Sequence, residues 1–293
     1  MKRRAVGRDL GLTLRMLLAL VLLAAFYAGI AAGVIAIFWW QPGWLAYGIA
    51  ICAITLLAAV AHFRGSESLV LRSAGARSLA TGSERHLQRR LERLAELADL
   101  PVPRLAVVDT ETPNAFTVGI APARAVVAVT RGLSRVLNER ELDAVLAHEL
   151  SHIANRDASV LTVVAFPRTL GLTLIADESL AGMVLWVVWP LGLPLWAIGT
   201  LLTLTVSRYR EYAADRGAAL LTGAPELVMS ALQKLSDEHI PSGDLRLQGA
   251  AEAFCIVPVR SRRFELFMDH PPLRKRLAAL EELARTLAKP ARG

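Results

Sequence analysis

A stretch of 48 residues without Asp, Glu, Lys or Arg, from Met16 to Phe63, is the feature that most constrains the fold of this chain. Gln41-Pro42-Gly43 interrupts it and leaves two apolar segments, Met16 to about Trp39 and Trp44 to about His62. Each segment is close to the ~20 residues that a helix needs to cross a bilayer. Tryptophans flank the interruption, where aromatic rings favour the membrane–water interface. We therefore expect two transmembrane helices joined by a short turn.

The charges on both sides of this stretch predict its orientation. Residues 1–15 carry five basic side chains and one acidic side chain. The charged residues directly after Phe63 are also mainly basic. The positive-inside rule then places the N-terminus and the chain after Phe63 in the cytoplasm. The alternative, a cleaved signal peptide, has an apolar core of only about 7–15 residues. The first segment is longer and a second follows at once, so we expect no cleavage.

Composition excludes several classes of protein. The chain is 54% hydrophobic, which is too apolar for an ordinary soluble protein. Its two cysteines, Cys52 and Cys255, cannot form a disulfide framework or a cysteine-based zinc site. The net charge of +7 is explained by topology and solvated helix surfaces. Because no nucleic-acid-binding module accompanies that charge, we expect no nucleic-acid partner.

Residues 148–152 have the sequence His-Glu-Leu-Ser-His. Two histidines four positions apart on a helix project from the same face, so His148 and His152 can both reach one zinc ion at about 2.0–2.1 Å. Glu149 is then placed to take a proton from a zinc-bound water. This pattern on a helix is typical of zinc metalloproteases. The sequence therefore predicts two metal ligands and a general base.

The context of this motif favours a helix over a chance match. Apolar residues recur at helical spacing from Leu137 to Asp157, which predicts one helix over that range. Asn138 is a candidate N-cap, and Glu141, three residues later, completes a capping-box pattern. The motif thus lies where its chemistry requires it.

A catalytic zinc needs a third protein ligand and an open position for water. Glu211 and Asp215 are four positions apart in a segment that looks helical from Ser207 to Leu221. We predict that Glu211 binds the zinc and that Asp215 accepts the free ring N–H of a ligating histidine. The alternative is an exposed, charged helix face, which would be the better interpretation without the upstream motif.

Two apolar segments, 158–176 and 180–206, separate the proposed ligands. His152 and Glu211 can share a zinc only on one side of the membrane, so the number of crossings between them must be even. We favour two crossings, giving four transmembrane helices in total. A hairpin that dips into the bilayer remains the alternative, because Arg168 is costly near mid-bilayer.

The remaining sequence predicts a mainly helical protein with a small β-sheet. The amphipathic segment 83–100 is typical of a helix, and segments 104–110 and 123–130 are typical of strands, with a third, exposed strand expected within 113–119. Further helices are expected at 224–239 and 272–288. We divide the chain into a membrane hairpin (1–64), a first catalytic part (65–157), a second membrane hairpin (158–206) and a second catalytic part (207–293).

Together these motifs resemble the HtpX family of membrane zinc metalloproteases, relatives of the CAAX prenyl-protein endoproteases. The resemblance runs from about Gly65 to the C-terminal helix. Its motifs are Ser66-Glu67 with Gly75-Ala76-Arg77, Asn114-Ala115-Phe116, the stretch from Val126 to Leu133, Glu141-Leu142, His148 to His152, Ser207-Arg208 with Glu211, Ala214 and Asp215, and His270-Pro271-Pro272 with Arg276. It implies a gluzincin-type catalytic domain whose active site faces the cytoplasm.

The resemblance also gives roles to two further regions. Asn114, Ala115 and Phe116 are similar to the family's active-site edge strand, which implies substrate binding through backbone hydrogen bonds; without the resemblance, Pro113-Asn114 favours a β-turn. His270 and Arg276 are similar to a downstream pair near the zinc. His270 is a candidate oxyanion donor and Arg276 a candidate substrate-binding residue. The alternatives are a position beside a helix start for His270 and an exposed helix arginine for Arg276.

The sequence therefore predicts a zinc-dependent endopeptidase of the bacterial inner membrane, with one zinc per chain. We expect it to cleave cytoplasmic segments of membrane proteins or peptides in protein quality control, alongside other membrane quality-control proteases. One alternative is a dedicated protease that cuts a single signalling partner. Others are a prenyl-protein processing enzyme and a catalytically silent zinc-binding membrane scaffold.

Overall fold

The computed structural model describes residues 70–78, 84–119, 121–176, 189–237 and 270–288, together with isolated positions between 14 and 68. The chain divides into two compact units. One contains Glu67–Val160 and Ser207–Gly293, and the other contains Leu10–Ser66 and Leu161–Val206. Most of the two expected N-terminal spans, and residues 238–269, lie outside the described residues. Within the part of the chain that is described, no helix is long and apolar enough to cross a membrane.

A four-stranded mixed sheet organises the first unit. Its strands are β1 (Arg77–Ser78), β2 (Arg104–Val108), β3 (Ala115–Val118) and β4 (Val126–Thr130). They lie in the order β1-β2-β4-β3, with β2 and β4 parallel and the other pairs antiparallel. Strand β3 is therefore an edge strand, as the family resemblance implies for this segment.

The two faces of the sheet pack against different clusters of apolar side chains. Successive residues of a strand point to opposite faces. Phe116 and Val118 pack with Val70 on one face, whereas Ala115 belongs to the larger cluster that includes Leu150 of the motif helix. All four side chains of β3 are buried. The expectation of an exposed strand is therefore wrong for its side chains, because apolar residues cover both faces.

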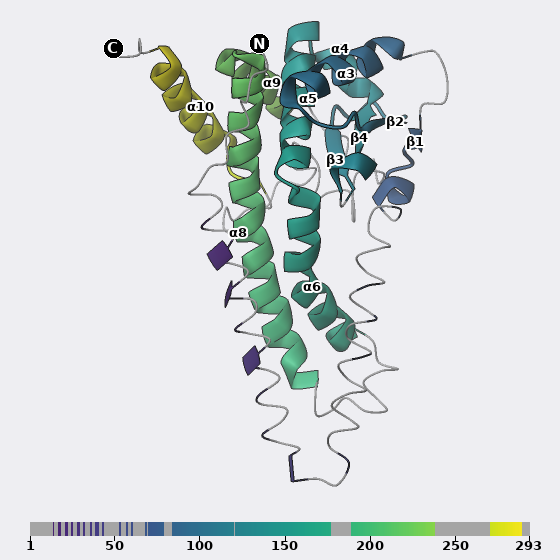
Figure 1. Ribbon diagram of the computed structural model, residues 1–293, viewed down its shortest axis with the longest axis vertical. Coiled ribbons are helices and arrows are strands. Elements are labelled where there is room, and N and C mark those ends of the chain that lie inside the picture. Colours follow the sequence, from purple (N-terminus) through teal and green to yellow (C-terminus); the bar gives the residue numbers. More distant parts are fainter. Residues whose placement is uncertain are drawn as a thin grey trace. The chain divides into compact units, whose positions relative to one another are not determined.

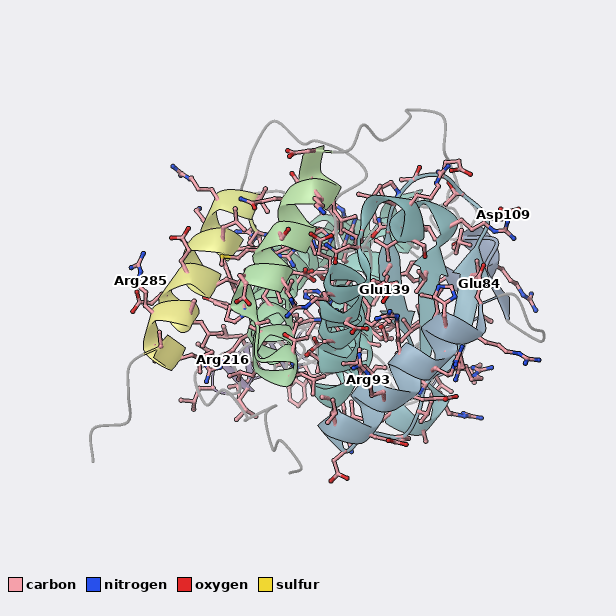
Figure 2. All side chains as sticks on the ribbon, turned by 90° about the horizontal axis from the view of Figure 1, so that it is seen from above. Glu84, Arg93, Asp109, Glu139, Arg216 and Arg285 are labelled. Carbon is pink, nitrogen blue, oxygen red and sulfur yellow. The ribbon has the colours of Figure 1, made fainter. Side chains whose placement is uncertain are left out.

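Helices α3 (Arg85–Ala98), α4 (Arg131–Val136) and α5 (Glu139–Ala154) belong to the same unit. Helix α3 is amphipathic as expected and buries Leu87, Leu91 and Leu94. It packs on α5, and Figure 2 marks the two helices by Arg93 and Glu139. At this contact Arg90 and Arg93 both pair with Asp143 of α5, at 2.9 and 2.5 Å. The motif helix thus packs against α3 and against strand β3.

The predicted capping box of α5 is confirmed. The Asn138 side chain accepts from the backbone N–H of Glu141, and the Glu141 carboxylate accepts from the backbone N–H of Asn138. The predicted end of this helix is wrong by three residues. The chain leaves the helix after Ala154, Arg156 adopts a left-handed conformation (φ 56°), and Asp157 begins the next helix.

Two long helices contribute to both units, α6 (Asp157–Ala176) and α8 (Trp189–Thr222). The helix expected from Ser207 therefore begins 18 residues earlier and carries the apolar segment before it. In the second unit α6 and α8 lie side by side (Figure 1): a Cβ at Gly199 would come within 2.4 Å of the Arg168 backbone nitrogen. Helices α9 (Pro225–Asp237) and α10 (Leu273–Ala288) follow near their expected positions and pack together.

Candidate active site

Two ring nitrogens of α5 converge at the centre of the site. His148 and His152 are one helical turn apart, and their Nε2 atoms are 3.1 Å apart. The rings meet edge to face at an interplanar angle of 88°. Both side chains are buried, with exposed fractions of 1% and 7%. The i, i+4 spacing therefore brings both nitrogens to one point, as the sequence predicts for this pattern.

Helix α8 brings a carboxylate to the same point. Glu211 Oε2 lies 3.7 Å from His148 Nε2, and Glu211 Oε1 lies 3.6 Å from His152 Nε2. The helices approach closely nearby, since a Cβ at Gly217 would be 2.4 Å from Ser151 Oγ. Among the described residues, His148, His152 and Glu211 form the one group of such side chains that could hold a metal ion.

The spacing of these atoms fits a tetrahedral metal site. Ligand bonds of about 2.0–2.1 Å at tetrahedral angles separate two ligand atoms by about 3.3–3.4 Å. The observed separations, 3.1 to 3.7 Å, lie on both sides of that value. In addition, Glu211 Oε2 is buried without a hydrogen-bond partner among the described residues. A cation would satisfy this oxygen and the two facing nitrogens, so the residues fit a bound metal.

Each histidine has a carboxylate beside its other ring nitrogen. His148 Nδ1 lies 3.0 Å from Asp215 Oδ1, and His152 Nδ1 lies 2.6 Å from Asp157 Oδ2. Both carboxylates are buried. A proton held on Nδ1 by such a carboxylate leaves the Nε2 lone pair free for a metal.

Asp157 is a functional candidate that the sequence patterns do not predict. The sequence pattern predicts it as the last residue of the motif helix, whereas it is the first residue of α6. The buried guanidinium of Arg210 is also beside it, with Nε 3.4 Å from Asp157 Oδ2. The sequence does show an acidic residue five positions after His152. The structure adds the interruption of the helix at Arg156, which brings the Asp157 carboxylate to His152.

Glu149, the residue after His148 in α5, is completely buried. Its Oε2 accepts a hydrogen bond of 2.6 Å from Thr117 Oγ1 of strand β3. Its Oε1 has no hydrogen-bond partner among the described residues. One oxygen of the carboxylate, Oε2, is therefore fixed by a hydrogen bond, and the other, Oε1, is available for proton transfer.

His270 and Arg276 lie beside the ligand carboxylate. His270 Nδ1 is 3.3 Å from Glu211 Oε2, and neither ring nitrogen has a hydrogen-bond partner in the described part of the chain. The Arg276 guanidinium donates to both oxygens of Asp215, at 2.7 and 2.6 Å, and Nη1 is 3.2 Å from Glu211 Oε2. With 3% of its surface exposed, Arg276 is not the exposed helix arginine of the alternative interpretation.

The charges around the site favour the ionised forms of Glu211 and Asp215. Burial would raise the pKa of Glu211, but its neighbours His270 and Arg276 outweigh burial and hold that pKa well below its usual range. Burial likewise opposes ionisation of Asp215, and Arg276 again lowers the pKa. For His148 burial favours the neutral ring, yet Asp215 and Glu211 raise the pKa. The two buried carboxylates, Glu211 and Asp215, thus share Arg276 as a positively charged neighbour.

The proposed substrate strand lies next to the motif helix. Strand β3 contacts α5, and Asn114 directly precedes it. The backbone N–H of Asn114 donates to Thr130 Oγ1 and its side-chain oxygen accepts from the backbone N–H of Ala115. Asn114, Ala115 and Phe116 are each 0% exposed. The buried side chains hold the strand in place. A peptide that binds along this edge would therefore contact the backbone N–H and C=O groups of the strand.

A helix that carries His-Glu-Leu-Ser-His and a second helix that supplies a glutamate define a metallopeptidase. Residues 82–284 match Peptidase family M48. The chain belongs to this family and, within it, to the HtpX type of metalloprotease.

Relatives match almost the whole chain. It is 41% identical to "Protease HtpX homolog" of Moorella thermoacetica, over 96% of this chain and 97% of the relative. It is 37% identical to "Protease HtpX homolog 2" of Methanosarcina acetivorans, over 98% and 100%. Among solved structures, "Crystal Structure of S. mikatae Ste24p" matches with a TM-score of 0.47 and 18% identity, over 93% of this chain and 67% of that chain.

Proposed function

We propose that this chain is a zinc-dependent endopeptidase that cleaves membrane proteins in segments close to the bilayer. The observation that carries the proposal is the convergence of His148, His152 and Glu211, with ligand atoms 3.1 to 3.7 Å apart, beside the buried carboxylate of Glu149. A structural zinc usually has four protein ligands and needs no adjacent base, whereas a catalytic zinc has three.

In this proposal His148, His152 and Glu211 hold the zinc. The bound metal would polarise the scissile carbonyl and bring the pKa of a water toward ~7. Asp215 and Asp157, which lie beside Nδ1 of the two histidines, would favour a proton on that nitrogen and leave each Nε2 lone pair available to hold the metal. Arg276 balances the charge of Asp215 and Glu211.

Glu149 acts as the general base. Its available Oε1 takes the proton of the attacking water, and the same carboxyl group then delivers a proton to the leaving amine. His270 supplies an N–H to the oxyanion of the tetrahedral intermediate. Support for this last role is that both of its ring nitrogens are buried without hydrogen-bond partners in the described residues, as expected of a group that bonds to substrate.

The substrate binds as an added strand along β3. Because the side chains of Ala115 and Phe116 are buried, recognition there uses backbone hydrogen bonds, which depend little on the substrate's sequence. Such tolerance suits an enzyme of protein quality control. The guanidinium of Arg276 is already paired with the carboxylates of Glu211 and Asp215. We therefore propose that Arg276 affects the bound peptide indirectly, through Glu211, and not by direct contact.

We place the protein in the bacterial inner membrane, with the N-terminus and active site in the cytoplasm. The uncharged stretch from Met16 to Phe63, with basic residues on both sides, supports the first membrane hairpin (1–64). The apolar sequence of segments 158–176 and 180–206 supports a second hairpin (158–206) between two catalytic parts (65–157 and 207–293). The lipid bilayer, membrane-protein or peptide substrates and other quality-control proteases are then its partners, and nucleic acid is not.

The test is zinc content and cleavage of an unfolded membrane-protein substrate in detergent, for wild type and Glu149→Gln. We expect about one zinc per chain in both proteins and a loss of about 10²–10⁴-fold in cleavage for the variant. Zinc in both with cleavage in neither would favour the silent scaffold. A single defined product in place of general degradation would favour the dedicated regulatory protease.

A further inference from the structure

Thr117 is the polar exception on an apolar face of the sheet. Side chains on the α5 side of β3 and β4 include Ala115, Val127 and Val129, all in one core cluster. Thr117 pairs in register with Val127 and is 6% exposed. Valine has nearly the same shape and an equal preference for strands, so packing alone does not require a hydroxyl at this position.

The hydroxyl of Thr117 has a specific partner. Oγ1 donates to Glu149 Oε2 at 2.6 Å, and it also lies 3.4 Å from the Glu149 backbone oxygen. Both atoms belong to a residue of α5 that is completely buried. A hydrogen bond to an ionised carboxylate in such surroundings is shorter and stronger than a neutral one.

We propose that Thr117 is a positioning residue that fixes the carboxylate of Glu149 for proton transfer. With Oε2 held by the hydroxyl, Oε1 is the oxygen left to exchange a proton. Because threonine is β-branched, few χ1 rotamers are open to it in a strand, and the hydroxyl keeps its direction at little entropic cost. This inference rests on the proposed role of Glu149 as the base.

The same contact connects substrate binding with the base. Strand β3 is the proposed docking edge, and Thr117 is the residue of β3 whose side chain bonds to Glu149. A peptide that pairs with β3 restrains the strand, and the strand restrains the carboxylate through one hydrogen bond. The hydroxyl therefore serves the chemical step and contributes little to peptide affinity.

The experiment compares Thr117→Val, which removes the hydroxyl at constant shape, with Thr117→Ser, which keeps it. Thr203→Val is the matched control, because Thr203 is also buried but its hydroxyl bonds to the carbonyl oxygens of Val164 and Gly199. Purified full-length proteins are assayed for kcat and KM on a quenched-fluorescence peptide in detergent. Zinc content and thermal unfolding are measured on the same samples.

We expect Thr117→Val to lower kcat about tenfold with KM within about twofold of wild type, as for an interaction that acts in the transition state. Thr117→Ser should recover most of kcat, and Thr203→Val should match wild type. Zinc content should stay at about one per chain in all. If Thr117→Val does not fold, Thr117→Ala replaces it.

Two outcomes overturn the inference while leaving the proposed function intact. One is wild-type kcat in Thr117→Val when Glu149→Gln is inactive. The other is an equal loss of kcat in Thr117→Ser and Thr117→Val. By contrast, cleavage by Glu149→Gln at the wild-type rate would overturn the proposed function itself.

Discussion

His152 Nδ1 lies 2.6 Å from Asp157 Oδ2, across the point where α5 ends and α6 begins. The left-handed conformation of Arg156, which costs a non-glycine residue roughly 1–2 kcal/mol, separates the two helices. Asp157 is therefore both the first residue of α6 and the partner of a proposed metal ligand. The interruption of the helix, which has no glycine or proline, is part of how the site is built.

We predict that Asp157→Asn weakens zinc binding by about 10–100-fold, because an amide no longer holds the Nδ1 proton of His152 as firmly as a carboxylate does. Zinc affinity is measured by competition with a chromophoric chelator on detergent-purified protein. Asp143→Asn is the matched control, because Asp143 of α5 is also a paired acidic residue but its partners are two arginines of α3. Equal affinities in Asp157→Asn and wild type would show that Asp157 has no part in metal binding.

Local features of the site could be predicted from the sequence. The N-terminus of α5 depends on Asn138 and Glu141, which are three residues apart and bond to each other's backbone. The two histidines need only the helical repeat to reach one point. Glu211 could be predicted as a ligand because Asp215 lies four positions later on the same helix face, and the upstream His-Glu-Leu-Ser-His motif indicates a metal site.

The missed features depend on contacts that no local pattern reveals. Thr117 reaches Glu149 across 32 positions of sequence, and that contact follows from β3 being packed on α5. The sequence does not predict that α8 begins at Trp189. Its first part is apolar and its last part is charged, so the two parts suggest a membrane segment and a separate soluble helix. The burial of β3 side chains was missed because the covering residues, including Val70, precede it by more than 40 positions.

Arg276 should stabilise the site through charge and not through substrate contact. Its guanidinium donates hydrogen bonds to both oxygens of Asp215. Without the guanidinium, the buried carboxylates would be left unpaired, which is costly in free energy. We predict that Arg276→Ala lowers the free energy of unfolding by about 3–5 kcal/mol, the usual effect of removing one partner of a buried pair. Thermal and denaturant unfolding are the measurements.

Two variants distinguish this role from a surface effect. Arg285→Gln, on the same helix and 68% exposed at its side chain, should change stability by less than about 0.5 kcal/mol; Figure 2 shows Arg285 projecting from α10. Arg276→Lys keeps the charge but loses the two parallel hydrogen bonds, so it should fall between the other two. A change in KM alone for Arg276→Lys would instead support the substrate-binding role.

Stability should depend on pH through Glu141, which joins α5 to α9. Burial would raise its pKa, but hydrogen bonds from Lys234 and Ser230 outweigh burial and lower it below the usual 4.5. A depressed pKa means that the stabilisation is complete above pH 4.5 and is lost as pH falls through the lower folded-state value.

The variant Glu141→Gln should therefore be less stable than wild type at pH 7, by about 1 kcal/mol after allowance for the part-exposed Lys234. The difference should shrink as the pH falls below 4.5. Melting temperatures of both proteins from pH 7 to pH 3 test this, with Glu139→Gln, which has an exposed side chain on the same helix, as the control. A difference that is constant with pH would exclude an ionic contribution from Glu141.

The close contact of α5 and α8 depends on the absence of a side chain at Gly217. A Cβ there would lie 2.4 Å from Ser151 Oγ and 2.8 Å from Ser151 Cβ, and Ser151 stands between Glu149 and His152. Gly217→Ala should therefore push the helices apart, costing about 1–3 kcal/mol as overpacking does. Since the helix preference of alanine favours the variant by up to about 1 kcal/mol, a net loss of stability would reflect the contact itself.

Removal of the opposing atom tests the same contact from the other side. Ser151→Ala takes away Oγ, so the double variant Gly217→Ala/Ser151→Ala should lose less stability than the sum of the two single changes. Zinc affinity should follow the same order, because Glu211 lies six residues before Gly217 and moves with α8 relative to the two histidines. Additive effects on both stability and zinc affinity would mean that the helices separate elsewhere, and that Gly217 does not set the distance between the ligands.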